Sequence, residues 1–499
     1  MCALVALLLS PAVAGSRPDL ASPESQGISS AAITNWIAVC EREIDALHGF
    51  VILRHGVKVA EGTWAPFDTL AKPHMLYSHS KSFTSTAIGF LVDAGKLDLD
   101  ERIVDIFADK APANPSDNLK ALRVRDLLTM NVGADRTDPE DKDIGGDWEK
   151  LFLTNEINVK PGTRFRYDSS ATYMLAAIVR RKTGKDLMAF LKEKLFDKIG
   201  ITSAWSSTCP NGTPCGGWGM YMTTGDMARF GQFLLNEGTW NGERILSAEW
   251  IRLATARQTW SGPIGITGQS GNDWAQGYGF QFWRCRHDAY RADGADGQFT
   301  IVVPKADLVV SLHAGCRTTQ KEVETVWNHL LPALKDAPLA DDPAALKALR
   351  ARCASLALPP VDGVADGADR FLDKTVSLEE NCRGFKTVRL AREGDGLAFS
   401  FETRAGLQTI PVGFGAWREG KAVIDPENYE GLGMYIGEHP TAASAAVGAD
   451  GALKLRVYVT DTPGRFDFTF AETNAALSVT GNLRIMRGCD LKGTLRVSR

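Results

Sequence analysis

Ser78 and Lys81 form the only Ser-x-x-Lys sequence in the chain, and such a pair can carry out nucleophilic chemistry. At the start of a helix, side chains three residues apart share one face, so the Lys81 amine can reach the Ser78 hydroxyl. Burial and the positive end of the helix lower the pKa of such a lysine, and its neutral amine then acts as a base. The backbone N–H groups of the helix start can stabilise an oxyanion. Roughly one such pair is expected by chance in a chain of this length, so the plain alternative is a capped helix with a solvated lysine.

Two further segments add groups to this candidate site. Tyr167 lies in a loop before an expected helix, and its phenol can relay a proton to a leaving group if it lies beside Lys81. The run Tyr290–Phe299 is rich in glycine and leads into a strand. A backbone N–H from this run, which we assign to Ala295, can complete an oxyanion hole with the N–H of Ser78. Taken singly, a loop tyrosine usually packs its ring and a glycine run usually forms a plain turn.

Other chemistries find little support in the sequence. The chain has eight histidines, and none of them form His-x-x-x-His. His74 and His79 are the one close pair, and no Cys or Glu beside them completes a metal site. A Gly-x-Ser-x-Gly elbow and a phosphate-cradling loop are both absent from the sequence, which argues against an α/β-hydrolase and a nucleotide enzyme. The sequence therefore indicates no metal and no cofactor.

Strand-like runs at both ends of the region 23–337 enclose a mostly helical middle. A hairpin at 49–54 and 57–64 opens the region, and strands at 278–284, 298–303 and 308–313 close it. Strands that share one sheet must come together around the middle, which predicts an α+β domain with a helical insertion. The expected helices span 31–47, 78–94, 122–130, 173–182, 224–236 and 319–334.

The composition changes twice after this region. Residues 338–370 are rich in Ala, Asp, Pro and Gly, which is typical of a linker. From 371 to 499, short alternating runs are separated by Gly, Asp and Asn, and they predict a small all-β barrel or sandwich. This segment contains no nucleophile–base pair, so we expect an accessory domain.

Bulk properties bound the function. Hydrophobic residues make up 44% and charged residues 23% of the chain, which is ordinary globular material. The net charge is −4 without a basic block, so a nucleic-acid partner is not indicated. Residues 1–14 combine a short apolar run with small residues up to Ala14, which predicts a signal peptide and a secreted or periplasmic protein. No segment approaches the roughly 20 apolar residues of a spanning helix.

Cysteine usage agrees with export. The chain has nine cysteines, and removal of Cys2 with the leader leaves an even number. Disulfides are therefore expected, and free buried thiols are the alternative. The pairing we consider joins Cys209 with Cys215 across a short loop, Cys285 with Cys316, Cys382 with Cys489, and Cys40 with Cys353.

The three chemical segments, in this order, resemble the serine β-lactamase and penicillin-binding superfamily in its class C-like branch. The resemblance runs from about Pro23 to Leu334 and includes Gly217–Thr224 before a helix and the strand entry Gly294–Pro304. It implies an antiparallel sheet flanked by helices, an all-helical part, and an active site between them. It also implies that Ser78 forms an acyl-enzyme that water hydrolyses.

Two other sequences match accessory motifs of class A β-lactamases by letter only. Ser116-Asp117-Asn118 lies in a loop, and Lys182-Thr183-Gly184 ends an amphipathic helix. The superfamily needs that lysine on a strand next to the serine, whereas Gly184 here is placed to cap a helix. We interpret both as structural.

The substrate is indicated by departures from the class C pattern. Ser169 stands where Asn is usual, and Ala292 stands where Lys or His begins the strand motif ending at Gly294. A cation there grips the carboxylate of β-lactams and of peptide C-termini. With Ser169, Ala292 and Gly294 lining the substrate site, the chain looks more like nylon-oligomer (aminohexanoate-dimer) hydrolases and related carboxylesterases, with D-aminopeptidases as further relatives. We therefore expect an amidase or esterase acting on a small or oligomeric substrate.

Two alternatives stay open. Arg166, Arg291 or the loop 135–147 can supply charge recognition, which would favour a β-lactamase or D-peptide hydrolase. The second alternative is a non-catalytic, penicillin-type sensor or binding protein that keeps the fold. The natural substrate, the role of the C-terminal segment and the oligomeric state are not indicated by the sequence.

Overall fold

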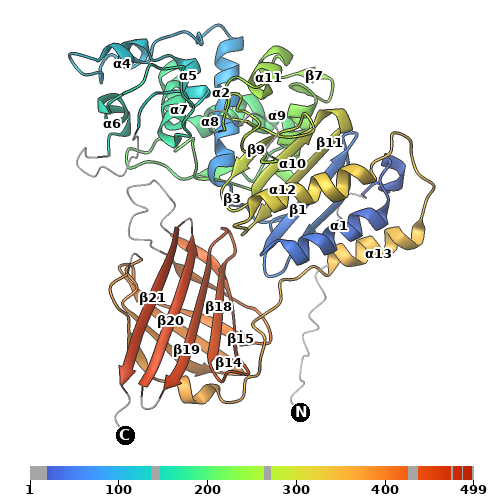
Figure 1. The fold of residues 1–499 in the computed structure, drawn as a ribbon, viewed down its shortest axis with the longest axis vertical. Coiled ribbons are helices and arrows are strands. Elements are labelled where there is room, and N and C mark those ends of the chain that lie inside the picture. The colour runs from blue at the N-terminus through green and yellow to red at the C-terminus, as the bar shows by residue number, and fades with distance from the viewer. Residues whose placement is uncertain are drawn as a thin grey trace, which may run out of the picture.

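The computed structural model describes residues 20–135, 146–262, 271–381, 383–424, 437–473, 476–485 and 487–496. They form an upper body of helices around a sheet and a lower body of long strands (Figure 1). The predicted signal peptide, residues 1–14, lies outside the described part of the chain. No helix in the described ranges has the length and apolar character needed to cross a membrane.

A six-stranded sheet forms the centre of the upper body, in the order β2-β1-β11-β10-β9-β8. Strands from the two ends of the region meet in it as predicted, because β1 pairs antiparallel with both β2 and β11. The expected strand 278–284 is mostly loop and keeps only its last two residues as β8, whereas the glycine-rich run supplies β9. The strands are β1 (Leu47–Arg54), β2 (Val57–Thr63), β8 (Trp283–Arg284), β9 (Tyr290–Gly294), β10 (Gln298–Val303) and β11 (Leu308–Ala314).

Helices cover both faces of this sheet because its strands are apolar on both sides. Along β1, Phe50 and Ile52 enter one core, and Val51 and Leu53 enter the other. The first core lies under α1 (Ser30–Glu43), α12 (Thr319–Thr325) and α13 (Pro343–Ala354). On the opposite face, α10 (Thr224–Leu235) packs across β1, β10 and β11. The expected helix 319–334 continues past α12 as a π turn, Val326–Leu330, and a 3-10 turn, Leu331–Ala333.

The helical part lies between the strands in sequence and is built around α2 (Ser80–Asp93) and α7 (Ser169–Thr183). From Ser80 to Gly89 every residue of α2 is buried, so this helix is surrounded by neighbours on all sides. The further helices here are α3 (Ile103–Ile106), α4 (Asp117–Ala121), α5 (Val124–Leu128), α6 (Trp148–Thr154), α8 (Leu187–Leu191), α9 (Asp197–Ile199) and α11 (Ala248–Thr255).

The structural interpretation of the two class A-like sequences is confirmed. The Ser116 side chain caps α4 by accepting a hydrogen bond from the backbone N–H of Leu119. Lys182 lies in the last turn of α7 and bonds Glu101, and Gly184 ends that helix in a left-handed conformation with φ of 73°.

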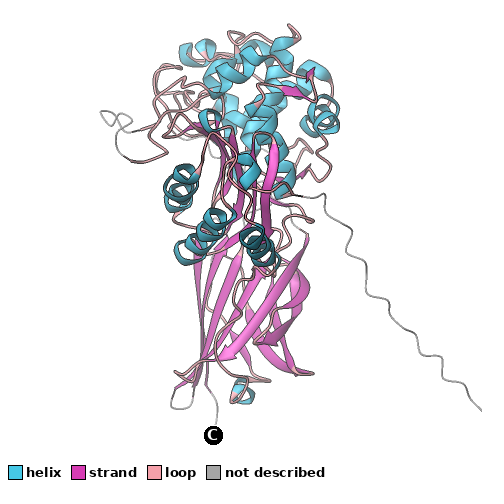
Figure 2. Cartoon of the chain, turned by 90° about the vertical axis from the view of Figure 1, so that its right-hand side faces the viewer, coloured by secondary structure: helices cyan, strands magenta, loops and turns pink. Residues whose placement is uncertain are grey.

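The lower body is a ten-stranded, nearly closed, barrel-like sheet, so the predicted all-β fold is confirmed (Figure 2). A bridge between Leu378, just after β12, and Gly493 in β21 brings the two ends of the sheet together. Buried phenylalanines, among them Phe399, Phe401 and Phe468, fill its core. The strands are β12 (Thr375–Ser377), β13 (Thr387–Glu393), β14 (Gly396–Thr403), β15 (Gly406–Phe414), β16 (Arg418–Val423), β17 (Glu438–Val447), β18 (Leu453–Val459), β19 (Arg465–Thr473), β20 (Ala476–Ile485) and β21 (Arg487–Arg496).

The segment 338–370, expected to be a linker, contains a helix. Asp342 caps α13 by accepting a hydrogen bond from the N–H of Ala345, and α13 packs against α1 and β2. Alanine and leucine dominate its sequence, so its apolar side can dock while the composition still reads as linker-like. The connection between the two bodies is thus shorter than the composition predicted.

The two bodies touch close to the candidate nucleophile. The turn between β18 and β19 reaches β3 (His74–Met75), where the backbone N–H of Met75 donates to the carbonyl oxygen of Asp461 at 2.8 Å. Beside this bond, the rings of Phe67 and Tyr458 meet with centroids 5.2 Å apart. The strand that leads to Ser78 is therefore held from the C-terminal body.

The expected disulfides are not formed among the six cysteines that the structure describes. Burial raises the pKa of the Cys40 and Cys215 thiols, which keeps them in the neutral form. The side chains of Cys382 and Cys489 lie outside the described residues.

Candidate active site

Ser78 is held at the start of a buried helix by a constrained backbone. It lies in a 3-10 turn, Tyr77–His79, that runs directly into α2. Tyr77 has a positive φ of 46°, which is uncommon for a non-glycine residue. The Ser80 hydroxyl donates to the Tyr77 carbonyl at 2.7 Å and accepts from the Met220 N–H at 3.2 Å. The turn therefore fixes Ser78 while leaving its side chain half-buried.

The Lys81 amine has three polar neighbours. Its Nζ lies 3.0 Å from the Oγ of Ser78, 2.9 Å from the Oγ of Ser169 and 2.5 Å from the carbonyl oxygen of Gly217. A carbonyl oxygen only accepts, whereas a serine hydroxyl both donates and accepts. A neutral amine has two N–H donors and one lone pair. It can donate to Ser169 Oγ and to the Gly217 carbonyl while its lone pair accepts the Ser78 hydroxyl proton.

Burial controls the charge of this lysine. Lys81 is 1% exposed, and desolvation lowers its pKa from 10.5 to about 7. The carboxylates of Asp168 and Asp293 act in the opposite direction, because a nearby negative charge favours the ammonium form. The amine consequently changes charge near neutral pH.

Tyr167 contacts the same hydroxyl. Its phenol hydrogen-bonds the Ser78 hydroxyl, and Lys81 Nζ lies 4.8 Å from the centroid of its ring. The ring stacks on Trp283 with centroids 5.5 Å apart and meets Tyr278 edge-on at 6.2 Å. Burial raises the pKa of the Tyr167 phenol despite its bond to Ser78, so the phenol is protonated at neutral pH.

The two other partners of the Lys81 amine are Ser169, at the start of α7, and Gly217, in a loop that packs against it. The Asp168 carboxylate caps this helix by accepting from the N–H groups of Ser170 and Ala171, and Ser169 is its first residue. Gly217 passes so close to α7 that a Cβ there would lie 2.8 Å from the carbonyl oxygen of Ser169. A glycine is therefore required at 217 for its carbonyl to reach Lys81.

Strand β9 borders the nucleophile on its far side. A Cβ on Gly294 would lie 2.0 Å from the carbonyl oxygen of Leu76, so only glycine permits this approach. Ala295 follows as an exposed residue at the turn into β10, and its carbonyl accepts from the Gln298 side chain at 3.2 Å. Ala292 is 1% exposed and packs its methyl group in the core that contains Tyr77 and Tyr278. Position 292 thus carries a small apolar side chain that is buried in the core.

A family model for beta-lactamases matches residues 40–333, which is more than half of the chain. The chain belongs to the beta-lactamase family. The 6-aminohexanoate-dimer hydrolase of Paenarthrobacter ureafaciens is 27% identical over 270 residues, covering 50% of this chain and 67% of that protein. Penicillin-binding protein 4 of Amycolatopsis lactamdurans is 26% identical over 296 residues, covering 52% of this chain and 75% of that protein. This member of the beta-lactamase family is accordingly a hydrolase of the serine beta-lactamase superfamily.

Solved structures agree with this assignment at the level of the fold. A structure from Bacteroides dorei DSM 17855, provisionally assigned as a beta-lactamase, superposes with a TM-score of 0.50 at 17% identity. The match covers 61% of this chain and 99% of that one. The predicted α+β, beta-lactamase-like fold is confirmed.

Asp293 was not predicted as part of the site of this beta-lactamase family member, whereas its partner Arg291 was expected to be available for charge recognition and is instead buried. Asp293, on β9, acts electrostatically on both Lys81 and Tyr167, and burial raises the pKa of its own carboxyl. Arg291 donates to Asp293 at 2.7 Å and is fully buried, with its guanidinium 4.1 Å from the ring centroid of Trp274. Alternation along β9 would have placed these two side chains together, because they lie two residues apart on one face.

Metal ligation finds no support in the described ranges, where no group of three or more His, Cys, Asp or Glu side chains has the arrangement to hold an ion. His79 points away from the site, and its Nε2 lies 2.9 Å from the Thr300 hydroxyl. His74 instead meets His48, with 3.0 Å between their ring nitrogens.

Proposed function

We propose that the protein hydrolyses esters or amides through an acyl-enzyme on Ser78. The observation that carries this proposal is the position of the Lys81 amine, 3.0 Å from the Ser78 hydroxyl and held by two further acceptors. A buried amine that is neutral near pH 7 is a competent base for a serine nucleophile. The relationship to the 6-aminohexanoate-dimer hydrolase adds support for an amide or ester substrate.

In the proposed first step, Ser78 Oγ attacks the substrate carbonyl carbon and its proton passes to Lys81 Nζ. The backbone N–H groups of Ser78 and Ala295 stabilise the resulting oxyanion. As the intermediate collapses, the Tyr167 phenol donates its proton to the leaving group and regains one from Lys81. The carbonyl-to-leaving-group bond breaks, and the acyl group stays on Ser78.

In the second step the roles are reversed. Water attacks the acyl carbon while it transfers a proton to the Tyr167–Lys81 pair. Collapse of this intermediate returns a proton to Ser78 Oγ and releases the carboxylic acid. Ser169 and Gly217 keep the amine in place throughout, because each accepts one of its hydrogen bonds.

The charges around the site favour substrates without a carboxylate beside the scissile bond. Ala292 offers no cation, and Asp293 places a carboxyl group near Lys81. Arg291 is fully buried against Asp293 and Trp274, so its guanidinium is withdrawn from a substrate. These features argue against β-lactams and peptide C-termini as preferred substrates, since cationic groups usually bind their carboxylates.

Activity assays on purified protein test the proposal. Ser78→Ala is expected to abolish hydrolysis of p-nitrophenyl butyrate, and a fluorophosphonate is expected to label the wild-type protein on Ser78 as seen by mass spectrometry. Full activity of Ser78→Ala at an unchanged melting temperature would refute the nucleophile. Labelling without turnover of any ester or amide would favour a non-catalytic sensor instead.

A side-by-side substrate screen decides between the hydrolase classes. We expect esters and amide oligomers to be turned over faster than nitrocefin or D-alanyl-D-alanine peptides. Nitrocefin turnover at rates that rival ester hydrolysis would overturn the argument from Ala292 and Asp293. For the location, we propose that residues 1–14 direct export and are then removed. Edman sequencing of the exported protein tests this, and an N-terminus at Met1 would contradict it.

A further inference from the structure

A pocket of about 530 Å³ lies at the end of β9 away from the candidate nucleophile. Tyr290 begins β9 and lines this pocket, whereas Gly294 ends the strand beside Leu76 and Ser78. Its volume falls in the range of sites for small organic ligands, roughly 300–1,000 Å³. None of the groups that we assign to catalysis line it, so its occupant is distinct from the substrate.

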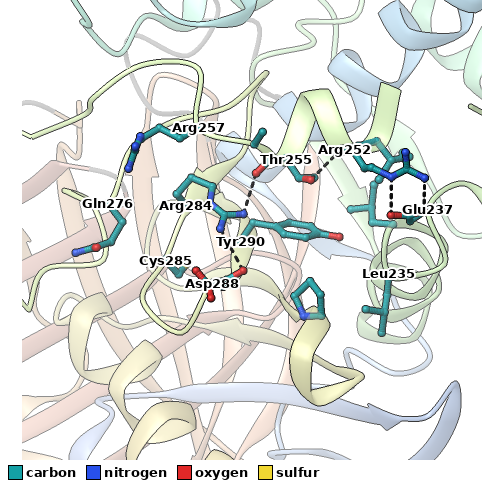
Figure 3. A pocket seen from close by; sticks show the side chains of 14 residues that line it. Leu235, Glu237, Arg252, Thr255, Arg257, Gln276, Arg284, Cys285, Asp288 and Tyr290 are labelled. Atoms are coloured by element: carbon teal, nitrogen blue, oxygen red, sulfur yellow. Dashed lines mark hydrogen bonds and ion pairs between the residues drawn. The ribbon is translucent and has the colours of Figure 1, made fainter. Parts of the chain in front are cut away.

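The acidic side chains of this pocket are already neutralised. Arg252 grips the Glu237 carboxylate with two hydrogen bonds of 2.9 and 3.0 Å (Figure 3). The Asp288 carboxylate pairs with Lys305, which follows the lining residue Pro304. Each acid thus has a cation of its own as ion-pair partner, Arg252 for Glu237 and Lys305 for Asp288.

Two guanidinium groups are left without a carboxylate. Within the described ranges, Arg284 donates to backbone carbonyls, that of Thr255 at 2.9 Å and that of Asp288 at 3.2 Å. Arg257 lies over the ring of Trp260 at 3.9 Å, and no carboxylate of the described residues pairs with it. Burial lowers the pKa of Arg284, and the positive charge of Arg257 acts in the same direction. The Asp288 carboxylate attracts Arg284 but is itself paired with Lys305, so two guanidinium groups line the pocket with less than one carboxylate between them, which is a recognition feature for an anion.

The rest of the pocket wall is apolar. Leu234, Leu235 and Ile251 line it, and the ring of Tyr290 lies between the Arg284 guanidinium and the Glu237–Arg252 pair (Figure 3). No hydrogen bond joins the Tyr290 hydroxyl to another residue in the described part of the chain. An occupant thus meets positive charge at one end and hydrocarbon with one free hydroxyl at the other.

We propose that this pocket binds a small organic carboxylate, with its carboxylate group between Arg257 and Arg284 and its apolar body along Tyr290 and the leucines. A planar guanidinium fork holds a carboxylate through two parallel hydrogen bonds, which gives Arg an advantage over Lys at such a site. The apolar wall distinguishes this ligand from inorganic phosphate, which has no hydrocarbon part.

Calorimetric titration of the full chain with benzoate, benzamide, benzylamine and phosphate at constant ionic strength tests the proposal. Benzoate is expected to bind at least about tenfold more tightly than its neutral isostere benzamide and than phosphate, and benzylamine is expected not to bind. Equal affinity for benzamide would overturn the charge argument, and tighter binding of phosphate would overturn the argument from the apolar wall.

Arginine variants locate the bound benzoate. Arg257→Gln removes an exposed guanidinium with little risk to folding, and it is expected to weaken benzoate at least about tenfold, whereas Arg284→Gln abolishes binding. Arg102→Gln, which removes the same charge from an exposed pair with Asp105, serves as the control and keeps the wild-type affinity. Unchanged affinity in Arg257→Gln would refute the site even if Arg284→Gln fails to fold. Benzoate binding is expected to persist in Ser78→Ala. The pocket and the proposed hydrolase function can therefore fail independently of each other.

Discussion

The Nζ of Lys81 lies 3.0 Å from the Oγ of Ser78, in a position where only 1% of the lysine is exposed. This relationship links the electrostatics of the protein interior to the proposed chemistry. The amine is close enough to accept the serine proton, and its desolvation makes the neutral form accessible near pH 7.

The pH dependence of ester hydrolysis follows from this lysine. The pKa of Lys81 is lowered to about 7, so its amine carries a proton below that pH and cannot act as a base. We expect kcat/KM for an uncharged ester to fall as the pH drops through about 7 and to level off above it. A pH–rate profile measures this, with circular dichroism at each pH as the folding control. A rate that stays constant from about pH 5 to 9 would contradict Lys81 as the base.

The Tyr167 phenol should matter more for poor leaving groups than for good ones. Tyr167→Phe removes the proton donor but keeps the ring on Trp283. An alkylamine must be protonated to leave, whereas p-nitrophenolate leaves as an anion. We therefore expect kcat to fall by about 10²-fold or more on an amide and much less on a p-nitrophenyl ester. Equal losses on both substrates, measured in parallel, would count against a proton relay through Tyr167.

Substrate charge provides a test of Asp293. Asp293→Asn keeps an oxygen that accepts from Arg291 but removes the negative charge near Lys81. The activity on mono-p-nitrophenyl succinate, relative to p-nitrophenyl butyrate, is expected to rise by roughly tenfold because a repulsive charge is lost. Asp105→Asn, on an exposed pair with Arg102, is the matched control. An unchanged ratio of kcat/KM values would exclude Asp293 from substrate selection.

Gly294 is expected to be intolerant of even one added carbon. The Cβ of Gly294→Ala would lie 2.0 Å from the Leu76 carbonyl oxygen, so the backbone beside Ser78 must shift. We expect a loss of about 1–3 kcal/mol in the free energy of unfolding together with a large fall in kcat. In the control Gly225→Ala, on α10, the nearest contact of the new Cβ is 4.0 Å away. Denaturant titration distinguishes the two variants, and equal stability would contradict the close approach of β9.

A second lysine variant separates charge from chemistry. Lys182→Met removes a partly exposed ammonium that pairs with Glu101. Lys182 lies in the last turn of α7, whereas Lys81 contacts Ser169 at the start of that helix. We therefore expect wild-type kcat and a change in the free energy of unfolding within about 1 kcal/mol. Lys81→Met removes the same charge and should abolish ester hydrolysis. Loss of activity in Lys182→Met would revive its interpretation as part of an accessory motif.

Patterns local in sequence predicted the structure well where local forces dominate. The hairpin of β1 and β2, the helix that carries Lys81 and the cap at Gly184 all depend on neighbouring residues. The helix expected over 173–182 starts earlier, at Ser169, and the helix that Ser116 caps was expected to be a loop. The central sheet was predicted for a different reason. Apolar strands at both ends of the region can be buried by pairing in one sheet that helices cover.

Other elements depend on distant partners and escaped prediction. Strand β17 has the sequence Thr-Ala-Ala-Ser-Ala-Ala-Val at 441–447, whose alanines have low strand propensity, and it forms because β16 and β18 pair with it on either side. Helix α13 was missed because alanine, aspartate and proline also typify linkers.

Within the site, residue type identified the groups that react, whereas the groups that hold them required the fold. Ser78, Lys81 and Tyr167 are recognisable by type and spacing, and the structure brings them together. The carbonyl of Gly217 carries no side-chain signal, and only its close approach to α7 makes it a partner of Lys81. The orientation of Arg291 also required the fold, because its guanidinium is held away from the site over the aromatic ring of Trp274.

The hydrogen bond from Met75 to Asp461 also has a consequence for the order in which the molecule is made. During synthesis, the strand that precedes Ser78 leaves the ribosome several hundred residues before its partner on the β18–β19 turn. Domains generally fold as units, N-terminal first. The upper body therefore folds with this edge unpaired, and the edge is completed only after β18 and the turn that follows it have been made.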